Sequence, residues 1–156
     1  MQREVVECSL KQLAPVIQEI LKEENSFTIR VTGNSMLPLW RDKRDLVTLA
    51  ACKQESLCKR DIVLYRRENG QYVLHRILRI RVDQMDLCGD AQTVIERDVP
   101  TSAVIAKVER ICSNGRWFSC DRWLYRWYSW SWCMLRPMRG FLLRVGGTCR
   151  RLIRKK

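Results

Sequence analysis

The dipeptide Asn69-Gly70 is the sequence feature that most constrains the fold, because an apolar run with a period of two residues lies on each side of it. Asn-Gly between two such runs is the strongest short signal of a β-hairpin, since both residues tolerate the positive φ angles of the tight turn. The flanking runs, 61–67 and 72–82, are therefore predicted to pair as antiparallel strands.

Several other short segments are predicted to be strands because their apolar residues have the same period of two. They are residues 27–32, 45–50, 85–88, 103–111 and 116–120. Many short strands joined by turns predict a curved sheet or a partly closed barrel. We therefore expect a mainly β (α+β) fold whose body, residues 27–115, is such a sheet or barrel.

Apolar residues near the N-terminus recur at helical spacing. They run from Val6 to Leu21 and predict an amphipathic helix within residues 1–26. No uncharged apolar run in the chain approaches the roughly 18 residues of a membrane-spanning helix. The stretch 1–12 also lacks the apolar region of a secretion signal. We expect a cytoplasmic protein, attached to a membrane only peripherally if at all.

The C-terminal tail, residues 116–156, has a different composition from the rest. It contains 11 Lys and Arg against 1 Asp, whereas residues 1–115 contain 18 Lys and Arg against 16 Asp and Glu. The tail also holds five of the six tryptophans. One apolar stripe at helical spacing comprises Trp123, Trp127, Trp130 and Met134, and a second begins at Met138. The tail is therefore predicted to be basic, aromatic and helical.

Three interpretations of this tail stay open. The aromatic stripe could pack on the β body and leave the arginines in water. Interleaved Trp and Arg also suit a helix that lies in a membrane interface and pairs with anionic lipid. The same side chains could bind nucleic acid through phosphate contacts and stacking. The scarcity of acidic residues favours an anionic partner.

The eight cysteines and the single histidine give little support to a metal site. No two cysteines have C-x-x-C spacing, so no zinc motif is present. Without a secretion signal, reduced thiols are expected. No metal and no cofactor is predicted.

The stretch VTGNSMLPLW, residues 31–40, presents Ser35 on a turn between a strand and Pro38. A serine in such a turn is commonly only a turn residue, but an exposed serine next to a base is a nucleophile. The candidate base is His75, which shares a strand face with Val73 and Ile77. A half-buried imidazole with a pKa near 6.5 suits a general base, although a packed core histidine fits the same pattern.

A carboxylate could orient this histidine. The segment 88–98 offers Asp90, Glu96 and Asp98. Asp90 follows Gly89 and could equally be a turn residue. The residues by themselves leave open which acid, if any, completes a triad, because triads occur in several chain orders.

Four segments together resemble the signal peptidase I-like serine peptidases, whose clan also contains the self-cleaving repressors of the DNA-damage response. They are TGNSMLPLW, CKRDIVLYRR, YVLHRILRI and CGDAQTVIERD, in this order, within about residues 28–111. The resemblance implies a β-rich, barrel-like fold with Ser35 as the nucleophile. It implies His75 as the base, in the place where most bacterial members have lysine. The Gly-Asp box falls on Gly89-Asp90, and its second acid falls on Glu96, with Asp98 as the fallback.

Three features depart from the family pattern, and one of them is the tail, residues 116–156, which is not part of the family's common catalytic core. Many members carry a hydroxyl residue two positions before the nucleophile, where this chain has Gly33. The oxyanion hole would then depend on backbone N–H groups of the turn formed by Gly33, Asn34, Ser35 and Met36, chiefly that of Ser35. Ordinary signal peptidases also have a membrane span at the N-terminus, and their active site faces the side to which proteins are exported. This chain is predicted to have only an amphipathic helix there, so the resemblance leaves its substrate undetermined.

The resemblance implies a serine endopeptidase that acts on a polypeptide, with a preference for small residues before the cut. Processing of a leader or signal peptide is one such role. The substrate is expected to lie extended along the strand that precedes Ser35. Self-cleavage at Ala50-Ala51 is another candidate. The alternative is a catalytically weak, peptidase-like module that docks on a membrane surface or nucleic acid through its tail.

Overall fold

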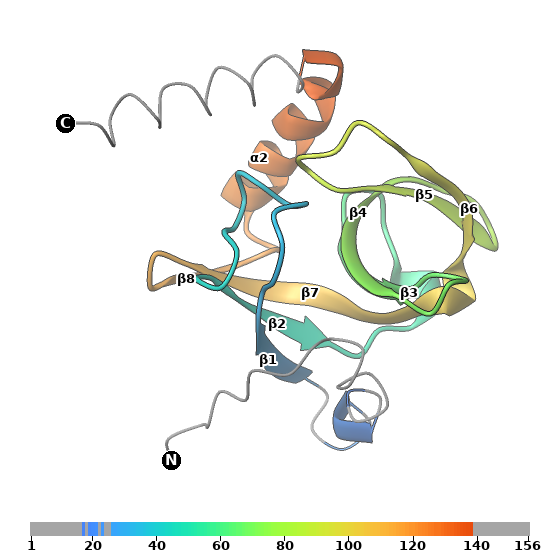
Figure 1. Cartoon of the computed structure of the whole chain (residues 1–156), viewed down its shortest axis with the longest axis horizontal. Coiled ribbons are helices and arrows are strands. Elements are labelled where there is room, and N and C mark those ends of the chain that lie inside the picture. Colours follow the sequence, from blue (N-terminus) through green and yellow to red (C-terminus); the bar gives the residue numbers. More distant parts are fainter. Residues whose placement is uncertain (1–16, 18, 22, 24–25, 139–156) are drawn as a thin grey trace.

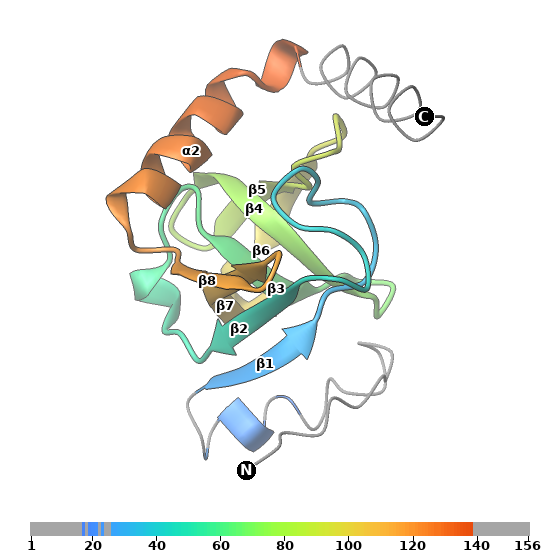
Figure 2. The same cartoon turned by 90° about the vertical axis from the view of Figure 1, so that its left-hand side faces the viewer.

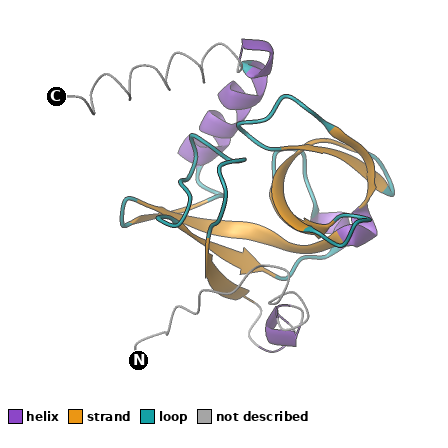
Figure 3. Ribbon diagram, in the orientation of Figure 1, coloured by secondary structure: helices purple, strands orange, loops and turns teal. Residues whose placement is uncertain are grey.

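The computed structural model describes residues 17, 19–21, 23 and 26–138. Eight antiparallel strands form one sheet, which curves strongly without closing (Figures 1 and 3). The strands are β1 (Ser26–Arg30), β2 (Leu46–Ala50), β3 (Ile62–Arg66), β4 (Tyr72–Ile80), β5 (Gln84–Cys88), β6 (Glu96–Pro100), β7 (Val104–Ser113) and β8 (Arg116–Ser119). The predicted mainly β fold with a curved sheet is confirmed.

The strand order is β1-β2-β7-β3-β4-β5-β6, and β8 pairs with β7 outside this path. Strands β1 and β6 are therefore the two ends of the described sheet. Single turns of 3-10 helix, η1 (Gln54–Ser56), η2 (Thr101–Ala103) and η3 (Arg136–Met138), join or follow the longer elements.

The hairpin predicted at Asn69-Gly70 connects β3 and β4. Gly70 has φ +80°, and its N–H donates to the carbonyl of Arg67 at 2.9 Å. The pairing that follows sets Val63 opposite His75. The turn thus fixes the register of the strand that carries the only histidine of the chain.

Strand β3 is buried on both faces, which explains its continuous apolar run. Ile62 and Leu64 contribute to the larger core cluster, which also contains Met36 and Trp40. Val63 and Tyr65 point the other way, into a second cluster with Ile77, Met85 and Leu87 inside the curve of the sheet. His75 lies on the same face of β4 as Val73 and Ile77, which belong to or pack against this second cluster.

Strand β6 was not predicted as a strand. Its sequence, ERDVP, has mostly polar residues and ends in proline. Such a composition is tolerated at the end of a sheet, where one side of the strand needs no partner. Its pairing with β5 nevertheless places Glu96 opposite Leu87, close to the second cluster.

The N-terminal helix predicted within residues 1–26 falls largely outside the described residues. Ile17, Glu19, Ile20, Leu21 and Glu23 are helical. Ile17 and Leu21 are buried in the larger core cluster, beside β1 (Figure 2). The described part therefore agrees with an amphipathic helix that packs through its apolar face.

The tail begins with β8 and continues into helix α2 (Trp123–Met134). Its buried residues are Tyr125 and Ser129, whereas Trp123 is 73% exposed and Trp127 is 64% exposed. The interpretation that the first aromatic stripe packs on the body is therefore wrong, because the opposite face of α2 makes that contact. The second predicted stripe, after its first member Met138, lies outside the described residues. Within the described part of the chain, no helix is long and apolar enough to cross a membrane.

Candidate active site

The loop 31–45, between β1 and β2, carries Ser35. Met36 and Trp40 anchor this loop because both side chains are buried in the larger core cluster. Gly33 has φ +85°, and its N–H donates to Asp42 Oδ1 at 2.8 Å. Asn34 accepts a hydrogen bond from the N–H of Leu37 through its carbonyl. The serine thus lies on a tight turn whose next residue is fixed in the core.

The Ser35 turn contacts the Gly89–Ala91 loop directly. The Ala91 N–H donates to the Ser35 carbonyl at 2.7 Å, and the Asp90 N–H approaches Met36 Sδ at 3.4 Å. A Cβ atom on Gly89 would lie only 2.6 Å from the Ser35 carbonyl oxygen. Glycine is therefore required there by the close approach of the two backbones, which gives the Gly-Asp box a physical reason.

His75 is fully buried in β4, between two polar neighbours. Its Nδ1 lies 3.1 Å from Tyr65 Oη and 3.1 Å from Glu96 Oε1. Glu96 is itself held by Arg67, whose Nε donates to Oε2 at 2.9 Å and whose second nitrogen donates to Oε1. The carboxylate is thus fixed beside the imidazole.

The electrostatics of this group favour a neutral imidazole and an ionised carboxylate. Burial lowers the pKa of His75 to about 4, and the charge of Arg67 adds to this effect while Glu96 opposes it. Burial alone would raise the pKa of Glu96, but hydrogen bonds from Arg67 and Tyr65 outweigh it and keep that pKa below its ordinary value. The expectation of a half-buried histidine with a pKa near 6.5 is therefore wrong, because desolvation dominates.

The second ring nitrogen of His75 is the unusual atom of this site. Nε2 is buried and has no hydrogen-bond partner among the described residues. An ionised Glu96 beside Nδ1 favours the tautomer with its proton on Nδ1, which leaves a lone pair on Nε2. A buried acceptor without a partner costs roughly 1–3 kcal/mol, so this nitrogen requires an explanation.

Ser35 Oγ is not hydrogen-bonded to this nitrogen in the structure. The two residues are instead linked through their neighbours. Arg76, next to His75, binds Asp90, and the residues on either side of Asp90 contact Ser35. The Ser35 turn thus contacts the loop that is held by Arg76, whereas His75 points to the other face of the sheet.

Asp90 pairs with Arg76, not with His75. Arg76 Nε and a terminal nitrogen donate to the two carboxylate oxygens of Asp90 at 2.8 and 2.6 Å, and both side chains are fully buried. Arg76 also donates to Tyr125 Oη at 3.1 Å and to the Ser129 hydroxyl. Helix α2 therefore helps to hold the Gly89–Asp90 loop, which the sequence patterns did not reveal.

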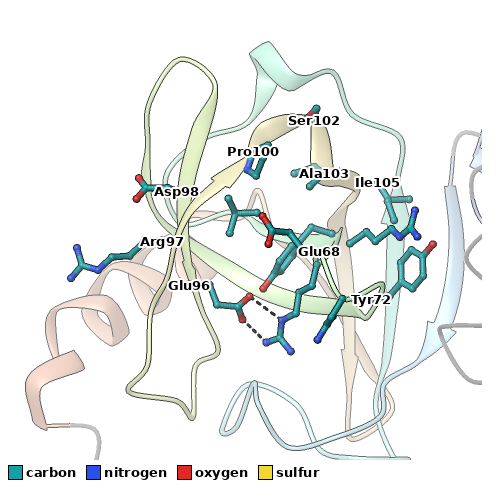
Figure 4. A pocket seen from close by; sticks show the side chains of 15 residues that line it. Glu68, Tyr72, Glu96, Arg97, Asp98, Pro100, Ser102, Ala103 and Ile105 are labelled. Carbon is teal, nitrogen blue, oxygen red and sulfur yellow. Dashed lines mark hydrogen bonds and ion pairs between the residues drawn. The ribbon is translucent and has the colours of Figure 1, made fainter.

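Asp98 points away from His75. It has φ +55° and lies where β6 has one residue more than β5, between the pairs Leu87–Glu96 and Met85–Val99. Such a bulge breaks the alternation of side chains. The Asp98 carboxylate is 61% exposed and pairs with Arg81 at 3.1 Å. Figure 4 shows Asp98 directed outward, away from Glu96, whose hydrogen bonds are drawn as dashed lines.

A pocket of about 900 Å³ lies on the Glu96 side of this group. Residues of β3, β6 and the start of β7 line it, together with the β3–β4 turn (Figure 4). Tyr65, Arg67 and Glu96 contribute to its wall, whereas Ser35 and His75 do not. The pocket therefore exposes the carboxylate of Glu96, which contacts Nδ1 of His75.

Breaking the buried Arg76–Asp90 pair is expected to destabilise the fold. Arg76→Met leaves Asp90 without its counter-ion and should lower the free energy of unfolding by about 3–5 kcal/mol. The double variant Arg76→Met/Asp90→Leu should recover most of this loss, since no buried charge remains. Urea unfolding followed by circular dichroism measures both. A single variant as stable as the wild type would contradict the assigned pairing.

Comparison with models of protein families gives a match over most of the chain. A model described as Peptidase S24-like matches residues 3–109, a span that includes Ser35, His75, Asp90 and Glu96 but not α2. No curated protein and no solved structure gives a match. The matched span exceeds half of the 156 residues, and the chain therefore belongs to the Peptidase S24-like family of serine-type peptidases.

Proposed function

We propose that this chain is a serine endopeptidase in which Ser35 is the nucleophile, His75 the general base and Glu96 the residue that orients the base. The observation that carries the proposal is the buried imidazole, with Nδ1 at 3.1 Å from Glu96 and Nε2 without a partner among the described residues. Such an imidazole is oriented by the contact at Nδ1 and keeps an acceptor at Nε2 that can take a proton.

The reaction would proceed by acyl transfer. Ser35 Oγ attacks the scissile carbonyl carbon while its proton moves to His75 Nε2, and the same proton then passes to the leaving amine. Glu96 stabilises the imidazolium that forms in between. Water, activated by the neutral His75, then hydrolyses the acyl-enzyme. These steps require Ser35 Oγ to come within hydrogen-bond reach of Nε2, a contact that the structure does not show.

The oxyanion would be stabilised by the backbone of the nucleophile turn. The Ser35 N–H makes no hydrogen bond to any described residue, whereas the N–H of Gly33 is already bonded to Asp42. With Gly33 in place of a hydroxyl residue, one donor is lacking. Loss of one such donor costs roughly 10²–10³ in rate in other proteases, so we expect slow turnover.

The substrate would bind as an extended peptide beside β1. This strand ends shortly before Ser35 and lies at one end of the described sheet, so its outer edge can pair with a peptide backbone. A leader peptide with a small residue before the cut fits this arrangement. Self-cleavage at Ala50-Ala51 is less compatible, because Ala50 pairs with Ser26, at the end of β2 farthest from the Ser35 loop.

Cleavage of a peptide library tests the function. The full chain is incubated with random decapeptides, and the new termini are identified by mass spectrometry. We expect cleavage in trans with small residues enriched before the cut, and no cleavage by a Ser35→Ala protein from the same preparation. Equal cleavage by both proteins would show a contaminant, and an inert wild type would contradict the proposal.

The pH dependence of the reaction follows from the burial of His75. The base must be unprotonated, and its pKa in the folded protein is about 4. Activity should therefore be present at pH 6–7 and fall as the pH drops through about 4, instead of through the value near 6.5 of an ordinary histidine. The measurement is kcat/KM against pH, with tryptophan fluorescence as the control for unfolding. A half-maximum near pH 6.5 would contradict the buried base.

A further inference from the structure

Helix α2 has two different faces. Tyr125 and Ser129 are buried against the body, and Trp132 Nε1 donates to the Asp90 carbonyl at 3.2 Å. The opposite face carries Trp123 and Trp127, one turn apart. The contacts of the first face explain why the helix is attached to the body. They do not explain why the second face carries tryptophans.

The outer face is a continuous apolar ridge. Its members are exposed by 73% (Trp123), 64% (Trp127), 48% (Trp130) and 64% (Met134). They lie at i, i+4, i+7 and i+11 and therefore on one stripe of the helix. Soluble proteins rarely leave a contiguous apolar surface of this kind uncovered, so such a patch marks an interaction site.

The charges around the ridge indicate which partner it fits. Arg122, at the N-cap of α2, and Arg126, within the helix, are both exposed, and residues 116–156 contain only one acid, Asp121, against 11 Lys and Arg. Indole rings prefer the headgroup level of a bilayer, and arginines next to them attract anionic lipid. A protein partner with an apolar groove would explain the ridge but not this excess of positive charge.

We propose that α2 docks in the plane of an anionic membrane, with Trp123, Trp127, Trp130 and Met134 inserted at the headgroup level. We call this set the tryptophan ridge. Because the other face of α2 binds Arg76 and the Asp90 carbonyl, docking would bring the Ser35 loop and the Gly89–Asp90 loop to the membrane surface. The proposal does not depend on the peptidase activity, since binding to lipid requires no catalysis.

Vesicle co-sedimentation of the full chain tests this proposal. The probes are vesicles of phosphatidylglycerol and phosphatidylcholine in equal parts, and vesicles of phosphatidylcholine alone. We expect binding to the anionic vesicles and at least about tenfold weaker binding to the neutral ones. The indole fluorescence should also shift to shorter wavelength on binding.

Two triple variants distinguish vesicle binding through the tryptophan ridge from general electrostatic attraction to the lipid. The ridge variant is Trp123→Ser/Trp127→Ser/Trp130→Ser. The control removes three exposed apolar side chains elsewhere, Val82→Ser/Val94→Ser/Trp117→Ser. We expect the ridge variant to lose about tenfold or more in affinity for anionic vesicles and the control to bind like the wild type.

Three outcomes would overturn the proposal. The first is absence of vesicle binding by the folded wild type. The second is equal affinity of the ridge variant and the wild type, because the basic residues alone would then account for the binding. The third is tighter binding to a single-stranded oligonucleotide than to the vesicles, with the same loss in the ridge variant, because the tryptophans would then act as a stacking surface.

Discussion

Replacing Ser35 with alanine is expected to lower kcat by roughly 10⁴-fold or more, because the variant has no atom that can form the acyl bond. His75→Gln should cause a loss of similar size, since the two residues act as one unit. The double variant should be no worse than either single variant. Single-turnover cleavage of a peptide found in the library measures all three.

Two controls make this result specific. Ser102→Ala removes an exposed serine on η2 and should leave kcat unchanged. Ser35→Ala should also keep the unfolding midpoint of the wild type, because the Ser35 side chain is only partly buried. A Ser35→Ala protein that retains a tenth or more of the activity would remove Ser35 from the mechanism.

The second large effect concerns the acid beside the histidine. Glu96→Gln keeps the shape of the side chain but removes the charge that favours the proton on Nδ1. In a comparable triad this kind of change costs about 10⁴ in kcat. Because Tyr65 also contacts Nδ1 at 3.1 Å, part of the orientation should survive, and we expect a loss of about 10²–10³.

Asp98→Asn is the matched control for this experiment. Asp98 lies on the same strand but pairs with Arg81, so its loss should change kcat by less than about twofold. The measurement is kcat at pH 7 for both variants, with the unfolding midpoint as the control for folding. A larger loss from Asp98→Asn than from Glu96→Gln would reverse the assignment.

The β3–β4 hairpin and most of the strands could be predicted because they depend on local rules. Asn69-Gly70 fixes a turn by its own φ angles, and alternating apolar residues identify strands that face a core. Strand β6 escaped prediction because it lies at an end of the sheet, where the apolar pattern is weak. The helix near the N-terminus can be compared only at the described residues.

The role of each acid could not be predicted, since it depends on neighbours distant in sequence. His75 and Arg76 are adjacent on β4 and therefore point to opposite faces of the sheet. Arg76 pairs with Asp90 on one face, and His75 meets Glu96 on the other. The order of the acids along the chain does not show which of them pairs with His75 and which with Arg76.

The orientation of α2 was beyond sequence analysis for a related reason. Both of its faces are aromatic, so periodicity alone cannot tell which one is buried. The decisive contact is the buried guanidinium of Arg76, which binds Tyr125 and Ser129. The need to satisfy this charge selects the inner face and leaves the tryptophan ridge outside.

The most direct test of the central claim is covalent trapping of the nucleophile. The protein is treated with a serine-directed covalent probe and digested, and the modified residue is located by mass spectrometry. We predict a single adduct on Ser35 that is lost in His75→Gln, while the control Ser102→Ala is labelled like the wild type. Labelling of another residue, or no labelling of a folded protein, would contradict the assignment of Ser35 and His75 as nucleophile and base.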